Sequence, residues 1–539
     1  MASRLLVIIK HTAKNKQNQK ALGFWLTVLF VSLVIQAYGF GFNRILLRNF
    51  IENSALLIML MSFSLLFNKY WKTIVQGIGF FVFWFNCLFE SLYYYLFKAN
   101  ISASSIFILL ETNLAEAKEF VEFYYNPFIV FVIVIFVIQL LLFLKIRPVF
   151  SISRKIIHQK IYYILAILIP LGLMIYKDFQ RYNFLYLSVD SVFEYIDEQQ
   201  KMSRFEIDRQ IADIQGFTIE KKVDTATYVL IIGESTTRNR MSLYGYNRTT
   251  TPFLDSLKPN LWVYNDVISS HAFTIGALRD ALVINGLQSK DDFSIIQMMN
   301  QAGFKTYWIS NQRPIGQYES LVTKIAMSSD VYITKNTALD GSITPKDEVL
   351  IPEFRNILNE DVPKKFIVLH PLGTHMKYED RYPSKFNKFK GNSPSKFNHP
   401  IAHERTNTYD NAVLYHDYFL EQIFKEMKKI KHPAYYLYFS DHGEEVYESI
   451  DFSGHAEEKP TKSMFEIPFF IWMNDEFKSN FKAAYLPENP FKLDNFIHTF
   501  SELNSISFKG VDSTKSLFSQ QNKSQRRRVG LGEFYDELP

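Results

Sequence analysis

The sequence predicts a protein in two parts: an N-terminal bundle of five transmembrane helices and a C-terminal soluble α/β sandwich. Three observations lead to this prediction. Nearly all of the long apolar runs lie within about the first 180 residues. After about residue 225, short apolar segments alternate with helical patterns, as in folds built on a mostly parallel sheet. Polar side chains gather where those short segments end.

The composition narrows the classes of protein to consider. The chain has 539 residues, enough for more than one domain, and a formal net charge of +5. That charge is small for the length, and the lone basic triplet 526–528 reads as a solvated tail, so nucleic-acid binding is not expected. The single cysteine, Cys87, lies in an apolar run, which excludes an intramolecular disulfide.

Five apolar stretches are long enough, or nearly so, to cross a bilayer as helices. A cleaved signal peptide is not expected at the first stretch, because the run is too long and no small-residue cleavage site follows it. We expect a transmembrane domain over residues 1–177, with helices at about 22–41, 54–68, 73–97, 126–145 and 161–177.

Basic residues alternate between the loops that connect these helices. Lys69 and Lys72 follow the second stretch and a basic cluster follows the fourth, whereas the loops 42–53 and 98–125 hold only two basic residues each. Because positively charged loops stay in the cytoplasm, we expect a cytoplasmic N-terminus and a C-terminal half outside the cytoplasmic membrane. Residues 178–224 look helical and charged, and would bridge the membrane domain to a soluble domain over 225–539.

The loop between the third and fourth helices contains the run ISASSIFILLETNLAEAKEFVEFYYN. Its second half has the pattern of an amphipathic helix, which would lie along the outer membrane–water boundary. Glu111, Thr112 and Glu116 would then lie where a lipid headgroup is handled. A simple solvated connector is the alternative.

The soluble half predicts strands and helices in alternation. Short apolar segments rich in β-branched or aromatic residues predict strands at 226–232, 261–268, 305–310, 365–370, 434–440 and 467–473. Helical patterns lie at 275–285, 291–302, 346–359 and 407–429. The polar stretch 376–406 is expected to form a loop over the site. Asp410 and Asp417, on the last helix, are expected to serve packing and capping.

Several polar side chains lie at or just beyond the ends of the expected strands. Glu234 follows the first strand, Asp441 and His442 follow the fifth, and Thr274 lies in the segment SSHAFTIGAL. His370 ends the fourth strand. In α/β sheets ligands gather beyond the carboxyl ends of the strands, so we expect these side chains to meet there.

The Glu, Asp, His and Thr side chains together suit a zinc ion, with manganese as an alternative. A cation would lower the pKa of the Thr274 hydroxyl, which could then attack a phosphodiester and form a covalent phospho-enzyme. His375 and His455 could bind the phosphoryl oxygens, hold a second cation or protonate the leaving group. Taken singly, Thr274 could be a structural hydroxyl, Glu234 a helix cap and His455 a surface residue.

Six runs carry a resemblance to a known family: GESTTRNRMSLYGYNRTTTPFLDSL, GTHMKYEDRYP, NTYDNAVLYHDYFLEQI, YFSDHGEE, SGHAEEKPTKSMFEIPFFIW and ETNLAEAKEF. They resemble the signatures of the phosphoethanolamine transferases of Gram-negative bacteria, within the alkaline phosphatase/sulfatase superfamily. The resemblance spans essentially the whole chain. It implies an inner-membrane protein with five membrane helices before a periplasmic catalytic domain.

The resemblance also implies roles for individual residues. The zinc ligands would be Glu234, Thr274, Asp441 and His442, with Thr274 also the nucleophile that carries phosphoethanolamine. His375 and His455 would contact the phosphoryl group, and Thr112 and Glu116 the ethanolamine end of the donor. The family uses phosphatidylethanolamine as donor, releases diacylglycerol and modifies lipopolysaccharide. One zinc ion, or two, would be bound.

Three departures from the family pattern bear on the acceptor and the donor contacts. Lipid A-directed members usually have disulfides in the soluble domain and a Thr-rich, Cys-containing segment at the nucleophile, where this chain reads SSHAFTIGALRDAL. This favours the branch that modifies core heptose or its phosphate. Ile108 stands where some members have a polar Asn, which weakens the expected headgroup contacts.

Other activities remain open at this point. They are transfer to lipid A or to another periplasmic glycan, phosphoglycerol transfer, and phosphodiester hydrolysis. A sulfatase is disfavoured, because its nucleophile derives from Cys or Ser in a C/S-x-P-x-R type of segment, which residues 269–279 lack. An inactive membrane scaffold is disfavoured by the presence of all four expected ligands.

Overall fold

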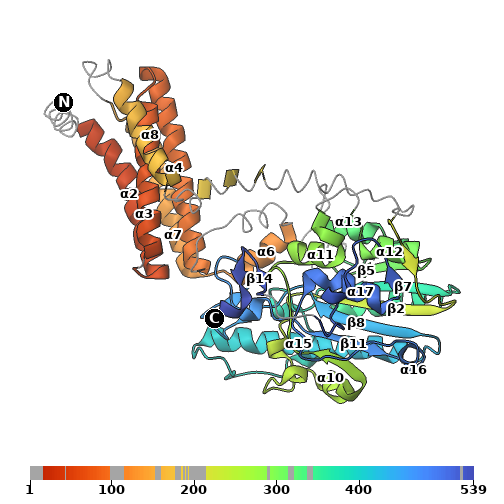
Figure 1. The fold of residues 1–539 in the computed structure, drawn as a ribbon. Coiled ribbons are helices and arrows are strands. Elements are labelled where there is room, and N and C mark those ends of the chain that lie inside the picture. The colour runs from red at the N-terminus through yellow and green to blue at the C-terminus, as the bar shows by residue number, and fades with distance from the viewer. Residues whose placement is uncertain are drawn as a thin grey trace. The chain divides into compact units, whose positions relative to one another are not determined.

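The computed structural model of the protein divides into two compact units, which are described separately here (Figure 1). The first unit comprises residues 1–110 and 124–195, and the second comprises 111–123 and 196–539. The expected bridge over 178–224 falls largely outside the described residues. The structure describes residues 16–42, 44–97, 114–151, 160–176, 184–185, 188–189, 192–193, 214–287, 292–312, 321–336, 344–521 and 526–539.

Helices occupy all five predicted positions in the first unit. They are α2 (Lys16–Phe40), α3 (Arg44–Ser64), α4 (Lys69–Phe97), α7 (Pro127–Ile146) and α8 (Lys160–Tyr176). Among the described residues, α2, α3, α4 and α7 are long and apolar enough to cross a membrane, whereas α8, with 17 residues, is shorter. Helix α3 begins at Arg44 rather than near residue 54, because polar residues such as Arg48 and Glu52 hide its first turns from a hydropathy pattern.

Aromatic packing and a polar cluster hold the first unit together. The rings of Phe80 and Phe143 stack with centroids 3.7 Å apart. Fully buried Glu90, on α4, accepts hydrogen bonds from the amides of Asn49 at 2.9 Å and Asn53 at 2.6 Å, both on α3. Its other oxygen accepts the backbone N–H of Phe184 at 3.0 Å. Hydrogen bonds of this kind join membrane helices where the hydrophobic effect cannot.

The second unit is built on a seven-stranded sheet in the order β3-β11-β8-β2-β7-β5-β6. Its five strands from β8 to β6 are parallel, and β11 pairs antiparallel with both β8 and β3. This confirms the predicted, mostly parallel sheet. The strands are β2 (Ala226–Gly233), β3 (Leu261–Tyr264), β5 (Lys305–Ser310), β6 (Val331–Thr334), β7 (Lys364–His370), β8 (Ala434–Ser440) and β11 (Phe469–Met473).

Two strands differ from the sequence prediction. Strand β6, at the edge of the sheet, was not predicted, because it has only four residues, all half-buried. The strand expected over 261–268 is broken into β3 and β4 (Val267–Ile268). Small pairs complete the sheets: β4 with β12 (Phe491–Lys492), β1 (Thr218–Ile219) with β13 (Ile506–Ser507), β9 (Glu445–Val446) with β10 (Ser453–Gly454), and β14 (Arg528–Val529) with β15 (Glu533–Phe534).

Helices cover both faces of the large sheet (Figure 1). Side chains of α11, α12 and α17 pack with Tyr228, Leu230 and Ile232, which alternate along one face of β2. Helix α15 lies on the other face, where the ring of His416 packs against Tyr438 of β8. The helices are α6 (Leu114–Phe123), α10 (Pro252–Leu257), α11 (Thr274–Leu282), α12 (Ile295–Gln301), α13 (Leu321–Met327), α14 (Ile351–Leu358), α15 (Pro400–Met427), α16 (Asp475–Lys478) and α17 (Phe496–Leu503).

Two details refine the expectations for this unit. Helix α15 starts at Pro400, earlier than predicted, because the His399 ring caps it by accepting the N–H of Ala402. As expected, Asp417 serves as a cap, since it accepts the backbone N–H groups of Phe253 and Leu254 at the start of α10.

In the basic triplet near the C-terminus, Arg526 and Arg528 are exposed, as the sequence suggests, whereas Arg527 is not. Arg527 pairs with Asp266 at 2.6 Å and is largely buried. Tertiary contact overrides the local charge pattern there.

Candidate metal centre

The main site begins at the end of β2, where Glu234 follows Gly233. Only glycine fits at 233, because a Cβ there would collide with the hydroxyl of Tyr438. Ser235 then turns the chain with a φ of 55°. Buried Tyr409 braces this turn, since its hydroxyl donates to the carbonyl of Ser235 at 2.8 Å and accepts the N–H of Thr237 at 3.0 Å. The Glu234 carboxylate is thereby held at the carboxyl edge of the sheet.

Asp441 and His442 follow β8, the strand next to β2. One carboxylate oxygen of Asp441 accepts the backbone N–H of Ser235 at 3.0 Å and that of His442 at 2.7 Å. The Nδ1 of His442 lies 2.8 Å from the carbonyl of Gly443, which can only accept, so Nδ1 carries the proton. Its other ring nitrogen, Nε2, is the one left to bind a metal, and it lies 3.4 Å from Glu234 and 3.5 Å from Asp441.

Thr274 is the first residue of α11, and its hydroxyl lies 3.2 Å from each oxygen of Glu234. It is half-buried, whereas Glu234, Asp441 and His442 are buried. Gly276 makes room at this turn, because a Cβ there would lie 2.8 Å from the rings of His271 and Phe273. The structure thus brings together all four residues that the sequence predicted as ligands.

The arrangement of these donors fits a divalent metal ion. Two donors on one tetrahedral zinc ion, each about 2.1 Å from it, lie about 3.4 Å apart, close to the 3.4 and 3.5 Å measured from the His442 Nε2. The Oδ2 of Asp441 and the Nε2 of His442 are buried and have no hydrogen-bond partner. Burying such atoms is costly unless a ligand pairs with them. The residues present therefore suit zinc.

Electrostatics at the centre also favour a cation. Burial raises the pKa of Asp441 to about 7, and the Glu234 carboxylate adds to this effect. Burial opposes protonation of His442, yet the carboxylates of Asp441 and Glu234 raise its pKa to about 10. Two buried carboxylates that attract a positive charge so strongly form the environment that a divalent ion needs.

Three further histidines lie around this centre. The ring of His455 lies 4.4 Å from the ring of His442, centroid to centroid. Burial lowers the pKa of His375, and that of His370 to about 4, although the Glu234 charge acts in the opposite direction on both. The Nδ1 of His375 and the Nε2 of His370 are buried without a hydrogen-bond partner. Neutral imidazoles with a free nitrogen are therefore available next to Glu234.

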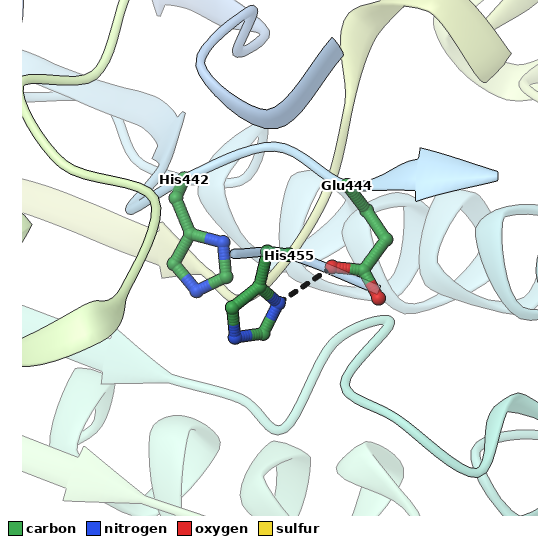
Figure 2. A group of neighbouring side chains, drawn as sticks. All are labelled: His442, Glu444 and His455. Atoms are coloured by element: carbon green, nitrogen blue, oxygen red, sulfur yellow. Dashed lines mark hydrogen bonds and ion pairs between the residues drawn. The ribbon is translucent and has the colours of Figure 1, made fainter. Parts of the chain in front are cut away.

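A second group of possible metal donors comprises His442, Glu444 and His455 (Figure 2). The Nδ1 of His455 lies 2.7 Å from the Glu444 carboxylate, so one donor pair of this group is already joined by a hydrogen bond.

The two residues expected to contact the donor headgroup are Thr112 and Glu116. Thr112 and the side chain of Glu116 lie outside the described part of the chain. Glu116 lies on α6, which we expect along the membrane surface; this helix belongs to the second unit and packs against the rest of it. Glu119 pairs with buried Arg381 at 2.7 Å, and the Phe123 ring lies under the guanidinium of Arg405.

The sequence missed several residues that support the site. The amide of Gln312 donates to Glu234 at 3.3 Å and to the carbonyl of Pro371 at 3.1 Å, from the loop after β5. Tyr409 braces the turn after Glu234, and Glu444 holds His455. Glu444 lies in the run YFSDHGEE, two residues after His442, and this position could have identified it from the sequence. Gln312 lies in no such motif.

Comparison with known proteins agrees with this geometry. Residues 226–506 match the Sulfatase family. The chain is 32% identical to phosphoethanolamine transferase EptC of Escherichia coli K12, over 96% of this chain and 95% of that protein.

Solved structures give the same result. A crystal structure of the C-terminal periplasmic domain of EptC from Escherichia coli, in complex with Zn, is 36% identical with a TM-score of 0.58, and covers 60% of this chain and 97% of that one. The integral membrane protein lipooligosaccharide phosphoethanolamine transferase A of Neisseria meningitidis shares the fold of the whole chain. Its TM-score is 0.65 at 19% identity, over 94% of this chain and 96% of that one. This chain belongs to the phosphoethanolamine transferases, inner-membrane, metal-dependent phosphotransferases with a sulfatase-type catalytic domain.

Proposed function

We propose that the protein transfers phosphoethanolamine from phosphatidylethanolamine to lipopolysaccharide, on core heptose or its phosphate, through a phospho-threonine at Thr274. One observation carries the proposal. The half-buried Thr274 hydroxyl lies 3.2 Å from both oxygens of Glu234, next to two buried donor atoms without partners. A nucleophile that substrate can reach, beside unmet metal donors, is what phosphoryl transfer requires.

Each residue then has a role in two displacements. Glu234, Thr274, Asp441 and His442 would hold a zinc ion, whose charge lowers the pKa of the Thr274 hydroxyl and offsets charge on the phosphoryl oxygens. The Thr274 proton passes to an imidazole nitrogen of His375 or His455, Oγ attacks the donor phosphorus, and the bond from phosphorus to the diacylglycerol oxygen breaks. The imidazole that took this proton returns it to the leaving oxygen, and the two histidines also contact the phosphoryl oxygens.

The second displacement returns the enzyme to its starting state. An oxygen of the acceptor attacks the phosphorus of phospho-Thr274, and the bond to Thr274 Oγ breaks. Thr274 Oγ regains a proton, and phosphoethanolamine remains on the acceptor. The free nitrogens of the buried, neutral imidazoles suit this exchange of protons.

The orientation in the membrane follows from charge. The loop after the second helix carries Lys69 and Lys72, and the loop after the fourth begins with Lys145 and Arg147. These basic loops support a cytoplasmic N-terminus and a catalytic domain in the periplasm. We propose a membrane domain over 1–177, a bridge over 178–224 and a catalytic domain over 225–539. Added ethanolamine groups would offset negative charge on the cell surface and weaken the binding of cationic antimicrobial peptides.

Mass spectrometry of lipopolysaccharide tests the proposal. Cells that express the wild type, Thr274→Ala or Thr274→Ser would be compared, with core and lipid A separated by mild acid. We expect a phosphoethanolamine increment on the core with the wild type, less of it with serine and none with alanine. An increment on lipid A would change the acceptor, and an increment that survives Thr274→Ala would exclude the phospho-threonine.

A further inference from the structure

The carboxylate of Glu444 is buried next to the metal centre and joins two side chains. Its Oε2 lies 2.7 Å from the Nδ1 of His455, the dashed line in Figure 2. Its Oε1 accepts the hydroxyl of Tyr378 at 2.6 Å. Glu444 is only 1% exposed, and Tyr378 is fully buried. A buried carboxylate is therefore provided with a donor on each oxygen, which offsets much of the cost of burying it.

This contact determines which nitrogen of His455 is available. A carboxylate accepts hydrogen bonds, so the Nδ1 of His455 donates to Glu444 and the other ring nitrogen, Nε2, faces away from it. Figure 2 shows the ring of His455 between Glu444 and His442. A ring that turned freely would present either nitrogen to a phosphoryl oxygen, whereas this one presents Nε2 alone.

Tyr378 connects the pair to α6. Its ring packs edge-on against Phe123, the last residue of α6, with centroids 5.5 Å apart, and against Tyr409 at 4.9 Å. Helix α6 is itself fixed by the ion pair between Glu119 and Arg381. The support of His455 thus reaches the segment that connects two membrane-spanning helices.

We propose that Glu444 and Tyr378 are positioning residues that hold His455 with its Nε2 toward the phosphoryl group, and that Phe123 of α6 completes this support. The inference rests on the proposed function, in which His455 contacts the phosphoryl group. Supports of this kind fix the tautomer and the direction of an imidazole. For metal-ligating histidines their loss typically costs about 10- to 100-fold in activity or metal affinity, and we expect a similar loss here.

Kinetics of the full-length enzyme in liposomes test the inference, with phosphatidylethanolamine as donor and purified lipopolysaccharide as acceptor. We expect Glu444→Met, which has similar length and no acceptor, to lower kcat about 10- to 100-fold with little change in KM for the donor. Glu444→Gln keeps an acceptor oxygen for His455 and should restore most of that loss. Zinc content should stay unchanged in both variants.

A double-mutant cycle separates positioning from a general structural effect. On a His455→Ala background, Glu444→Met should cost nothing further, because the residue that it positions is gone. Glu445→Met is the matched control. Glu445 is the next residue along and also buried, but it accepts hydrogen bonds from Glu448, Ser449 and Thr461, so any loss it causes should be the same on both backgrounds.

Each contrary result has a distinct meaning. An equal cost of Glu444→Met with and without His455 would overturn the positioning role. Loss of zinc in Glu444→Met would also overturn it and would make Glu444 a metal ligand in the second donor group. Full activity of His455→Ala would instead overturn the role of His455 in the proposed function, while transfer through Thr274 would stand.

Discussion

Two buried carboxylates, one in each unit, have opposite hydrogen-bond environments. In the membrane unit, Glu90 receives two amides and one backbone N–H, so each of its oxygens has a partner. In the catalytic unit, one oxygen of Asp441 receives two N–H groups and the other receives none, and the Nε2 of His442 beside it is also without a partner. An unmet buried polar atom costs about 1–3 kcal/mol. Glu90, whose oxygens are both paired, therefore has a structural role, whereas Asp441, with one unpaired oxygen, indicates a ligand-binding site.

The largest effect is expected at the unsatisfied carboxylate. Asp441→Ala removes a proposed ligand, so we expect transfer to fall roughly 10³-fold and bound zinc to be lost. Folding stability without metal should change little, because a costly buried charge is removed together with its hydrogen bonds. Zinc analysis by inductively coupled plasma mass spectrometry and thermal unfolding would check this. Normal zinc content in the variant would contradict the metal centre.

His416 shows that buried polar atoms without partners are not enough by themselves to make a site. Both of its ring nitrogens are buried without partners, but within the described part of the chain it belongs to no group of possible metal donors, and burial lowers its pKa to about 4. Because the unfolded chain binds this proton more readily, stability should be constant above about pH 6.5 and fall toward pH 4, by at most about 3 kcal/mol.

The variant His416→Phe should remove this part of the pH dependence without changing zinc content. Thermal unfolding at pH 4.5 and 7.5 would measure it. An unchanged difference between the two pH values would assign the acid sensitivity to other groups.

The satisfied carboxylate should behave in the opposite way to Asp441. Glu90→Leu leaves the amides of Asn49 and Asn53 and the N–H of Phe184 without their acceptor, so we expect a loss of about 2 kcal/mol in stability. Glu90→Gln keeps one acceptor oxygen and should lose less. The kcat per folded molecule should be unchanged in both. A lower kcat at unchanged stability would give Glu90 a role in the reaction and would contradict the functional difference between Glu90 and Asp441.

The smallest effect compares two carboxylates on α6. Glu119 is 18% exposed and pairs with Arg381, which is 2% exposed, whereas Glu122 is 43% exposed and pairs with Lys377. We expect Glu119→Gln to weaken the docking of α6 by about 1 kcal/mol, because Arg381 stays buried without its full partner. Glu122→Gln should have a smaller effect, because its ion pair lies in water. Hydrogen exchange of residues 114–123 would measure the stability of α6 docking in both variants. Equal effects would contradict the conclusion that the buried ion pair contributes more than the exposed one.

Local pattern was enough to predict much of this protein. Apolar runs and basic loops predicted the membrane helices, and short apolar segments predicted the strands β2, β5, β7, β8 and β11, because hydropathy and periodicity are properties of neighbouring residues. The boundaries failed where polar residues occupy helical positions, as at Arg44 in α3, or where a cap lies further upstream, as at His399 in α15. Glu234, Asp441 and His442 could be predicted because ligands gather beyond strand ends.

What only the tertiary structure decided depends on contacts between distant residues. The sequence does not say that β2 lies next to β8, which is what brings Glu234 to within 3.4 Å of His442. Nor does it say that α6 docks through Glu119 on Arg381, 262 positions away. The contacts of Gln312 with Glu234 and of Glu444 with Tyr378 likewise could not be predicted from the sequence. The chain determines by itself which groups can react or bind, and the packing of the sheet and its helices determines which of those groups meet, because their distances depend on the whole fold.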